Sequence, residues 1–399
     1  MKKTIAIVGG GASALMLACE LNSKKYNISL FEKNAALGRK FLVAGDGGLN
    51  LTHSENEKAF NLNYTPHQFL LPALTHFSNK DLVVSMNRLG IETFVGTSGR
   101  VFPKKGIKPI MVLEKFIETI RNKNIRVYFK HEWKGFSENN ELLFETPLGI
   151  KKQIFDSVIF CLGGASWPVT GSKGDWVHFF TEKSIQVNSF KASNCSFKIN
   201  WPNEIIKQIV GKPLKNCAIT CANKTHLGEV VLTNFGIEGS GIYPLSPLIR
   251  GEIEKYGSSK ITIDFKPQLS FNEVLKRISC PATKNSYTEN IAKQLNLTKT
   301  HLALLKANSN KHDFLDPVKL TAHLKKMELV ISELGPVNKA ISTVGGIDLN
   351  EISEKFELKK LKNNFVIGEM LDYDAPTGGY LLQSCFSMGK FLADYLNTL

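Results

Sequence analysis

The chain has 399 residues, of which 43% are hydrophobic, and its formal net charge at pH 7 is +14. This length suits about two or three domains with a large buried core, and no apolar run is long enough to span a bilayer. The seven cysteines are scattered and include no C-x-x-C pair, which argues against a disulfide framework and a zinc site. We therefore expect a cytoplasmic enzyme in a reducing compartment, with no bound metal.

The positive charge is spread along the chain rather than gathered in a tail. Only short lysine clusters occur, at 102–108 and 358–364. Such a charge suits a nucleic acid, an anionic membrane surface or an acidic cofactor, and a solvated basic surface is the simplest interpretation. We expect a small-molecule substrate rather than a nucleic acid, and a monomer or a weak homodimer.

The first segment, KTIAIVGGGASALMLACELN, predicts a strand that runs into a helix. Thr4 to Val8 is typical of a short buried strand, the glycines form a turn, and a helix begins at Ala12. A secretory signal is the alternative, because Lys2 and Lys3 precede an apolar stretch. The three central glycines argue against it, since each would cost a helix about 1 kcal/mol relative to alanine.

The glycine turn matches the dinucleotide-binding fingerprint, with Gly9, Gly11 and Ala14 at the spacing G-x-G-x-x-A. Gly9 permits the tight turn, Gly11 lets the backbone approach a pyrophosphate, and the small Ala14 lets helix and strand pack closely. The diphosphate is expected at the helix N-terminus, where unpaired N–H groups favour an anion. The second strand, NISLFEK, ends near Glu32, and a glutamate there favours an unphosphorylated ribose, as in NAD or FAD.

The segment after Glu32 differs from that of a simple NAD-binding domain. Arg39 and Lys40 are placed to balance phosphate charge, and the glycines between 45 and 48 let the backbone approach a flat ring. The sequence GRK followed by AGDGGLNLTHSE resembles the HI0933-like flavoproteins, also called the BaiN-type family. The usual motif of that family is close to G-R-K followed by T-G-x-G-R-C-N-L-T-N.

Further blocks resemble the same family, from the first strand to the last helix. They are, in order, GRVFPKK (99–105), CLGGASWPVTGSKGDW (161–176), TNFGIEGSGIYPLSP (233–247), AISTVGGIDLNEI (340–352) and GEMLDYDAPTGGYLLQ (368–383). Two departures fall at Leu49, where the family commonly has cysteine, and at Leu381, where it usually has asparagine. Because this chain lacks that cysteine and that asparagine, no substrate can be assigned from them. The FAD assignment does not depend on either residue.

The resemblance implies an α/β fold, in which a Rossmann-like FAD-binding domain of the glutathione-reductase type is interrupted by an inserted domain. We expect the two parts of the FAD-binding domain at 1–187 and 337–399. Short strand-like runs predict a β-barrel-like substrate domain at 188–269 and about 325–336. A polar sequence with a helical pattern predicts a small helical subdomain at 270–324.

The residue types and the resemblance together give the expected site. The predicted cofactor-binding residues are Gly9, Gly11, Ala12, Ser13, Ala14, Glu32, Lys33, Arg39, Lys40, Gly45, Gly47, Gly48, Asn50, Thr52, Gly163, Gly164, Gly368, Glu369, Asp372, Thr377, Gly378, Gly379 and Tyr380. The candidates for the open face of the flavin are Asn50, Tyr243 and Tyr380, and His53 is a candidate proton donor. Tyr243 lies in a glycine-rich loop of the insert, which we expect to close the pocket above the ring. The last helix is expected to direct its N-terminus at the flavin, where its dipole stabilises the reduced ring.

The resemblance implies an FAD-dependent oxidoreductase that moves hydride between the flavin and a small organic substrate or NAD(P)H. Only one dinucleotide fingerprint is present, so NAD(P)H would bind transiently as an electron donor rather than in a domain of its own. Amine oxidation and reduction of an enone both stay open. The alternatives are a flavoprotein that acts on RNA, of the tRNA-modifying type, and a non-enzymatic FAD-binding protein.

Overall fold

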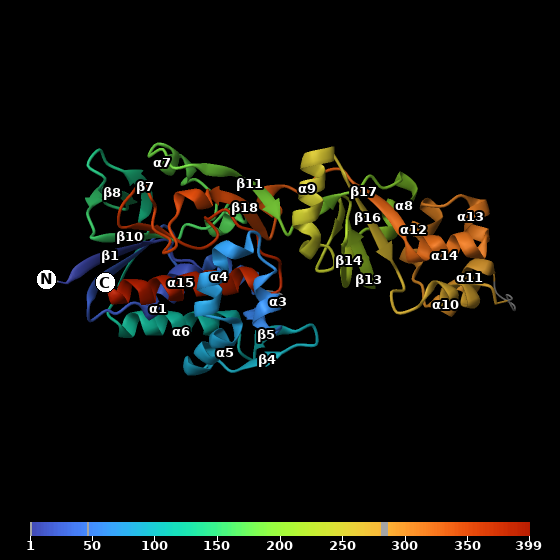
Figure 1. Cartoon of the computed structure of the whole chain (residues 1–399), viewed down its shortest axis with the longest axis horizontal. Helices are drawn as coiled ribbons and strands as arrows, with labels where there is room; N and C mark the ends of the chain where they lie inside the picture. The colour runs from blue at the N-terminus through green and yellow to red at the C-terminus, as the bar shows by residue number, and fades with distance from the viewer. Residues whose placement is uncertain (1, 46–47, 281–285) are drawn as a thin grey trace. The chain divides into compact units, whose positions relative to one another are not determined.

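The computed structural model describes residues 2–45, 48–280 and 286–399, and the chain divides into two compact units. The first unit comprises Met1–Ala192 and Val337–Leu399, and the second comprises Ser193–Pro336 (Figure 1). Each unit is built on a sheet of its own. The second unit is thus an insertion into the sequence of the first.

The first unit is organised around a parallel sheet of five strands in the order β19-β10-β1-β2-β6. Its strands are β1 (Lys3–Val8), β2 (Tyr26–Glu32), β6 (Arg126–Phe129), β10 (Ser157–Phe160) and β19 (Asn364–Val366). The central strand β1 pairs in parallel with both β2 and β10. Both faces of such a sheet are covered, which explains why β1 and β10 are almost continuously apolar. This arrangement confirms the predicted Rossmann-type α/β fold.

Helices cover one face of the parallel sheet, and a three-stranded meander covers the other (Figure 1). The helices are α1 (Ala12–Glu20), α6 (Pro109–Asn122) and α15 (Tyr380–Thr398). The meander consists of β7 (Glu132–Phe136), β8 (Leu142–Thr146) and β9 (Gly149–Gln153). Aromatic rings join the meander to the sheet, with centroids 4.7 Å apart for Trp133 and Phe160 and 4.2 Å apart for Phe144 and Phe31.

α1 and α15 pack closely because Gly389 has no side chain where the two helices meet. A Cβ at Gly389 would lie 2.7 Å from the backbone oxygen of Ser13. At the C-terminal ends of both helices, the side chain of Asn397 accepts a hydrogen bond from the backbone N of Asn22 (2.8 Å) and donates one to the backbone oxygen of Glu20 (3.2 Å). The helices therefore lie side by side and run in the same direction.

Smaller elements complete the first unit. A second sheet, in the order β3-β5-β4, consists of β3 (Thr52–His53), β4 (Thr93–Val95) and β5 (Arg100–Pro103). The remaining helices are α2 (Arg39–Ala44), α3 (Glu57–Asn61), α4 (His67–His76), α5 (Asn79–Arg88) and α7 (Val177–Thr181). β11 (Val187–Ser193) pairs with β18 (Ser342–Ile347), so the chain leaves and re-enters this unit along neighbouring strands.

The second unit contains an antiparallel sheet of six strands in the order β12-β15-β14-β13-β16-β17. They are β12 (Phe197–Lys198), β13 (Pro213–Cys221), β14 (Lys224–Leu232), β15 (Gly236–Glu238), β16 (Ser259–Asp264) and β17 (Met327–Ile331). After β17 the chain returns to β12, where the backbone N of Lys198 donates to Glu333 O (2.9 Å) and that of Ser332 donates to Lys198 O (3.1 Å). These hydrogen bonds join the two edges of the sheet, as a barrel-like domain requires.

In chain order, the described helices of the second unit lie between its first strand, β12, and its last strand, β17. They are α8 (Asn203–Ile209), α9 (Ser246–Tyr256), α10 (Phe271–Ile278), α11 (Tyr287–Leu295), α12 (Lys299–Ala307), α13 (Lys311–Leu315) and α14 (Pro317–Lys325). Ser270, Ser286 and Thr298 cap the starts of α10, α11 and α12 by accepting backbone hydrogen bonds. Across the described residues of both units, no helix is long and apolar enough to cross a membrane.

Two glycines of the second unit give opposite predictions for stability. At Gly236 in β15 a Cβ would lie 2.0 Å from the backbone oxygen of Phe197, so Gly236→Ala must push paired strands apart. At Gly251 in α9 a Cβ meets no atom within 4 Å, and alanine is the better helix former. We expect Gly236→Ala to lower the free energy of unfolding by about 1–3 kcal/mol, and Gly251→Ala to raise it by about 0.5–1 kcal/mol. Urea denaturation followed by circular dichroism measures both, and an unchanged or raised free energy of unfolding in Gly236→Ala would contradict the packing of β15.

Candidate functional site

A cleft of about 710 Å³ opens at the carboxyl ends of the parallel strands of the first unit. Val8 and Glu32 line it at the ends of β1 and β2, and Leu162 and Gly368 line it just beyond β10 and β19. All of its lining residues belong to the first unit. Its volume falls within the range of ligand pockets, about 300–1,000 Å³, and open α/β sheets bind ligands at this edge.

Most of the residues predicted to bind the cofactor lie along this cleft. They are Gly9, Gly11, Ala12, Ser13, Glu32, Lys33, Arg39, Lys40, Asn50, Gly163, Gly368, Glu369, Thr377, Gly378 and Gly379. The other predicted residues of the first unit do not line it, and these are Ala14, Gly45, Gly48, Thr52, His53, Gly164, Asp372 and Tyr380. Tyr243 belongs to the second unit, and Gly47 lies outside the described residues.

The glycine loop after β1 presents bare backbone to the cleft. Gly9 has a φ of +101°, and a Cβ there would lie 2.4 Å from the backbone oxygen of Cys161, so this turn requires glycine. At Gly11, which precedes α1, a Cβ would meet no protein atom within 4 Å. α1 has no side-chain cap and no acidic residue in its first turn. Its first N–H groups are therefore available to an anion in the cleft.

The carboxylate of Glu32 ties the glycine loop to the turn that follows β2. Its Oε2 accepts a hydrogen bond from the backbone N of Gly10 at 2.8 Å. Its Oε1 accepts from the backbone N and the side-chain amide of Asn34, at 2.8 and 2.6 Å. Glu32 is only 8% exposed, and what remains exposed faces a cleft it helps to line. Because a carboxylate oxygen accepts two hydrogen bonds, Oε2 retains room for a ribose hydroxyl.

The two cations predicted to balance phosphate charge already have partners within the protein. The Nζ of Lys40 lies 2.6 Å from Oε2 of Glu369, in an ion pair that spans 329 positions of the sequence. Arg39 donates hydrogen bonds to Oδ1 of Asn34 (2.7 Å) and to the backbone oxygen of Val169 (2.9 Å). The carboxylate of Glu369, which is almost fully buried beside Lys40, therefore neutralises most of the charge that Lys40 would bring to the cleft.

The N-terminus of α15 also opens onto the cleft. Gly378 and Gly379 have φ angles of +109° and +96°, and a Cβ at Gly379 would lie 2.5 Å from the Cα of Thr52. α15 has no side-chain cap and no acidic residue in its first turn. In the same cleft, the Oδ1 atom of Asn50 is buried and has no hydrogen-bond partner among the described residues. Bare backbone donors and an orphaned amide oxygen together suit a ligand with both acceptors and donors.

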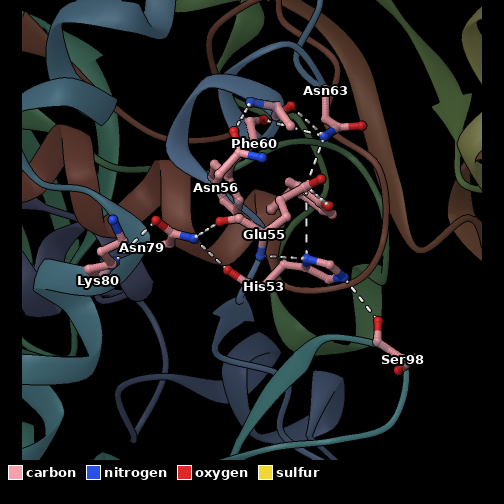
Figure 2. Close-up of polar contacts among 10 residues, drawn as sticks. His53, Glu55, Asn56, Phe60, Asn63, Asn79, Lys80 and Ser98 are labelled. Carbon is pink, nitrogen blue, oxygen red and sulfur yellow. Dashed lines mark hydrogen bonds and ion pairs between the residues drawn. The ribbon is translucent and has the colours of Figure 1, made fainter.

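His53 and Tyr380 belong to a polar cluster beside the cleft. The hydroxyl of Tyr380 donates to Oε1 of Glu55, and its ring stacks on that of His53 with centroids 5.6 Å apart. Nε2 of His53 lies 3.0 Å from the backbone oxygen of Ser98, and Nδ1 accepts from the backbone N of Glu55 at 3.2 Å (Figure 2). This pattern is that of a neutral imidazole with its hydrogen on Nε2, a tautomer assigned from the hydrogen bonds.

The cluster concerns two predictions, Tyr380 at the open face of the flavin and His53 as a proton donor. Burial, followed by the hydrogen bond to Glu55, raises the pKa of the Tyr380 hydroxyl well above its ordinary value, so the group stays protonated. Asn79, the first residue of α5, donates to the backbone oxygens of His53 (2.6 Å) and Glu55 (2.8 Å) (Figure 2). Neither His53 nor Tyr380 lines the cleft, and both support the start of α15 instead.

Two other predicted residues make contacts within their own units. Asp372 accepts hydrogen bonds from the backbone N of Gly345 (2.8 Å) and the side chain of Asn188 (2.7 Å), and so links β18 to β11. Tyr243 lies in a short 3-10 turn of the second unit. Burial, assisted by the nearby Glu238, raises the pKa of its hydroxyl to about 12.

The cleft also contains residues to which the sequence assigned no role. They include Gly10, Asn34, Arg100, Ser172, Lys173, Trp176 and Cys385. Four of these residues lie in the blocks GRVFPKK and CLGGASWPVTGSKGDW, which resemble the family. The sequence therefore marked these segments without indicating what the four residues do. Burial raises the pKa of the Cys385 thiol to about 11, which keeps it protonated near neutral pH. Among the described residues, no group of three or more His, Cys, Asp or Glu is arranged to hold a metal.

These features fit a flavin dinucleotide. FAD carries a pyrophosphate, an adenosine ribose and a ring whose polar edge has carbonyl acceptors and an N–H donor. The uncapped start of α1 beside Gly11 suits the pyrophosphate, and Glu32 suits the ribose hydroxyls. The uncapped start of α15 suits the ring carbonyls, and the orphaned Oδ1 of Asn50 suits the ring N–H.

Comparison with known proteins agrees with this fit. The family model described as HI0933-like protein Rossmann domain matches residues 3–395. The chain is 22% identical over 391 residues to a ribosomal RNA dihydrouridine synthase of Haemophilus influenzae, with 96% of this chain and 95% of that protein covered. It is 23% identical over 411 residues to a 3-dehydro-bile acid delta(4,6)-reductase of Clostridium scindens, with 96% and 97% covered.

A solved structure shares the fold along its whole length. It is the 3-ketosteroid delta1-dehydrogenase from Sterolibacterium denitrificans in complex with 1,4-androstadiene-3,17-dione. The TM-score is 0.51 with 11% sequence identity, and 100% of each chain is covered. At this identity the similarity concerns the arrangement of the chain and not its substrate.

Gly11 gives a test of the anion site at the start of α1. Gly11→Val adds a side chain where the Cβ meets no protein atom within 4 Å, at a φ of −82° that other residues adopt. We expect it to fold with a free energy of unfolding within about 0.5 kcal/mol of the unmodified protein. We also expect it to bind FAD at least about tenfold more weakly, a loss of about 1.4 kcal/mol, because the side chain occupies the space of the pyrophosphate. Titration of the apoprotein with FAD, followed by flavin fluorescence, measures this loss. Gly251→Ala is the control, and unchanged FAD affinity in Gly11→Val would place the phosphates elsewhere.

Proposed function

The chain belongs to the HI0933-like family, and from that premise we propose that it is an FAD-dependent oxidoreductase that adds hydrogen across a carbon–carbon double bond conjugated to a carbonyl group. The observation that carries the cofactor assignment is the cleft in which α1 and α15 both present uncapped N-termini. Two such termini offer backbone donors to the two parts of FAD that carry negative charge, the pyrophosphate and the reduced ring.

The choice of reaction rests on what two relatives have in common. One is named a ribosomal RNA dihydrouridine synthase and the other a 3-dehydro-bile acid delta(4,6)-reductase. Both names describe hydrogen added to a double bond that a carbonyl group activates, in a uracil ring or in a 3-oxo steroid. Enone reduction and amine oxidation are both open from the sequence, and this shared chemistry favours enone reduction.

The residues of the cleft bind and orient the cofactor in this proposal. The start of α1 and Gly11 hold the pyrophosphate, Glu32 holds the adenosine ribose, and Asn50 with the start of α15 orients the ring. When bound, FAD supplies hydride acceptance and donation. NAD(P)H is the proposed electron donor, and it would bind transiently because the chain has one dinucleotide fingerprint.

A second candidate substrate is a uridine within RNA. The net charge of +14 favours it, as does the name of the relative from Haemophilus influenzae. A uracil ring contains the same conjugated double bond as a small enone. The two candidates therefore differ in what carries the ring and not in the reaction.

The identity of the cofactor can be tested directly. The purified protein is expected to be yellow and to release FAD rather than FMN on heating, because Glu32 and the start of α1 suit the adenosine diphosphate half that FMN lacks. Mass spectrometry of the released ligand identifies it. Release of FMN, or a colourless protein that takes up NAD alone, would contradict the assignment of FAD.

The reaction is tested by anaerobic rapid mixing. The bound flavin is reduced with NADH or NADPH and then mixed with 2-cyclohexenone, a 3-oxo-4-ene steroid or a uridine-containing RNA, and its absorbance is followed. We expect reoxidation by at least one enone and none by cyclohexanone, which lacks the double bond. Reoxidation by the RNA alone would assign the second candidate. Rapid reduction of the oxidised protein by amines, with no response to any conjugated double bond, would overturn the proposed reaction.

A further inference from the structure

Arg100 is a half-buried cation that lines the cleft and has no anionic partner among the described residues. It begins β5 and lies opposite His53 of the antiparallel neighbour β3. The next residue of β5, Val101, is 2% exposed and belongs to the packed side of the small sheet. Within the described part of the chain, the guanidinium of Arg100 makes no hydrogen bond or ion pair with another residue.

Two other cations of the cleft have a carboxylate nearby, whereas Arg39 is bonded to neutral oxygens and Lys173 is exposed. Lys40 is paired with Glu369 at 2.6 Å, and Lys33 lies 4.0 Å from Glu132. Removing a guanidinium partly from water without an opposite charge is costly, and a cation in such a place is stabilised by any anion that enters the cleft. Arg100 is therefore placed for negative charge that the ligand brings.

The position of Arg100 indicates which part of the ligand carries that charge. A Cβ at Gly378 would lie 3.7 Å from the Nε atom of Arg100, so the guanidinium stands at the start of α15. The N-terminus of this helix of 19 residues is itself positive and has no side-chain cap. Two sources of positive potential thus converge at one place. The separate helix α1, beside Gly11, is available to the pyrophosphate.

We propose that Arg100 is a redox-tuning residue, which raises the affinity of the cleft for the reduced, negatively charged flavin above its affinity for the oxidised flavin. This inference rests on the proposed function, because it assumes that the cleft holds FAD. A charge at this point acts in a partly desolvated site and is weakly screened. It therefore favours the state of the cofactor that carries the extra negative charge.

The test is the midpoint potential of the bound flavin, measured by equilibration with reference dyes, together with the Kd for oxidised FAD. Arg100→Gln is expected to lower the affinity for reduced relative to oxidised flavin by about tenfold, which corresponds to a potential about 30 mV more negative for a two-electron couple. Arg100→Lys keeps the charge and is expected to change that ratio by less than about threefold. Lys104→Gln removes the same charge at an exposed residue just after β5, outside the cleft, and is expected to leave the potential unchanged.

Each outcome of this experiment decides the inference. An unchanged potential in Arg100→Gln, or an equal shift in Lys104→Gln, overturns it. Equal losses of affinity for oxidised and reduced FAD in Arg100→Gln also overturn it, and assign Arg100 to the pyrophosphate instead. If Arg100→Gln does not fold, Arg100→Lys decides instead. A potential in Arg100→Lys as negative as that of free FAD overturns the inference, because lysine keeps the positive charge. Failure of the unmodified protein to bind FAD at all would instead reject the proposed function.

Discussion

The close packing of α1 against α15 is the constraint on which the cleft depends. The two helices come from opposite ends of the chain, and they meet where Gly389 leaves room for the backbone of Ser13. Their C-terminal ends are joined through Asn397, so the helices run in the same direction and both N-termini open onto the cleft. Since each uncapped terminus carries about half a positive charge, this packing by itself creates a site for an anionic ligand.

The parts of the site with signals close together in the sequence could be predicted. Gly9, Gly11 and Glu32 lie within one strand, turn and helix unit, where backbone geometry ties each position to a task. The ion pair between Lys40 and Glu369 could not be predicted, because it joins residues 329 positions apart. Both were assigned to the cofactor from the residue type, and neither spacing nor composition indicates that a lysine will be neutralised by a distant carboxylate.

The direction in which a side chain points was the second feature that could not be predicted from the sequence. His53 and Tyr380 are next to segments that do line the cleft, and the sequence makes Tyr380 a candidate for the open face of the flavin and His53 a candidate proton donor. In the structure the short strand β3 and the first turn of α15 turn these rings toward each other and toward Glu55. One residue of register decides which face of a strand a side chain occupies, and only tertiary contacts fix that register for a strand of two residues.

The insertion of the second unit leaves the cofactor cleft complete. The chain departs along β11 and returns along β18, and Asp372 bonds to residues of both strands. Every lining residue of the cleft belongs to the first unit, so no stretch of the insertion is needed to build it. Cofactor chemistry and substrate choice can therefore reside in different stretches of the chain.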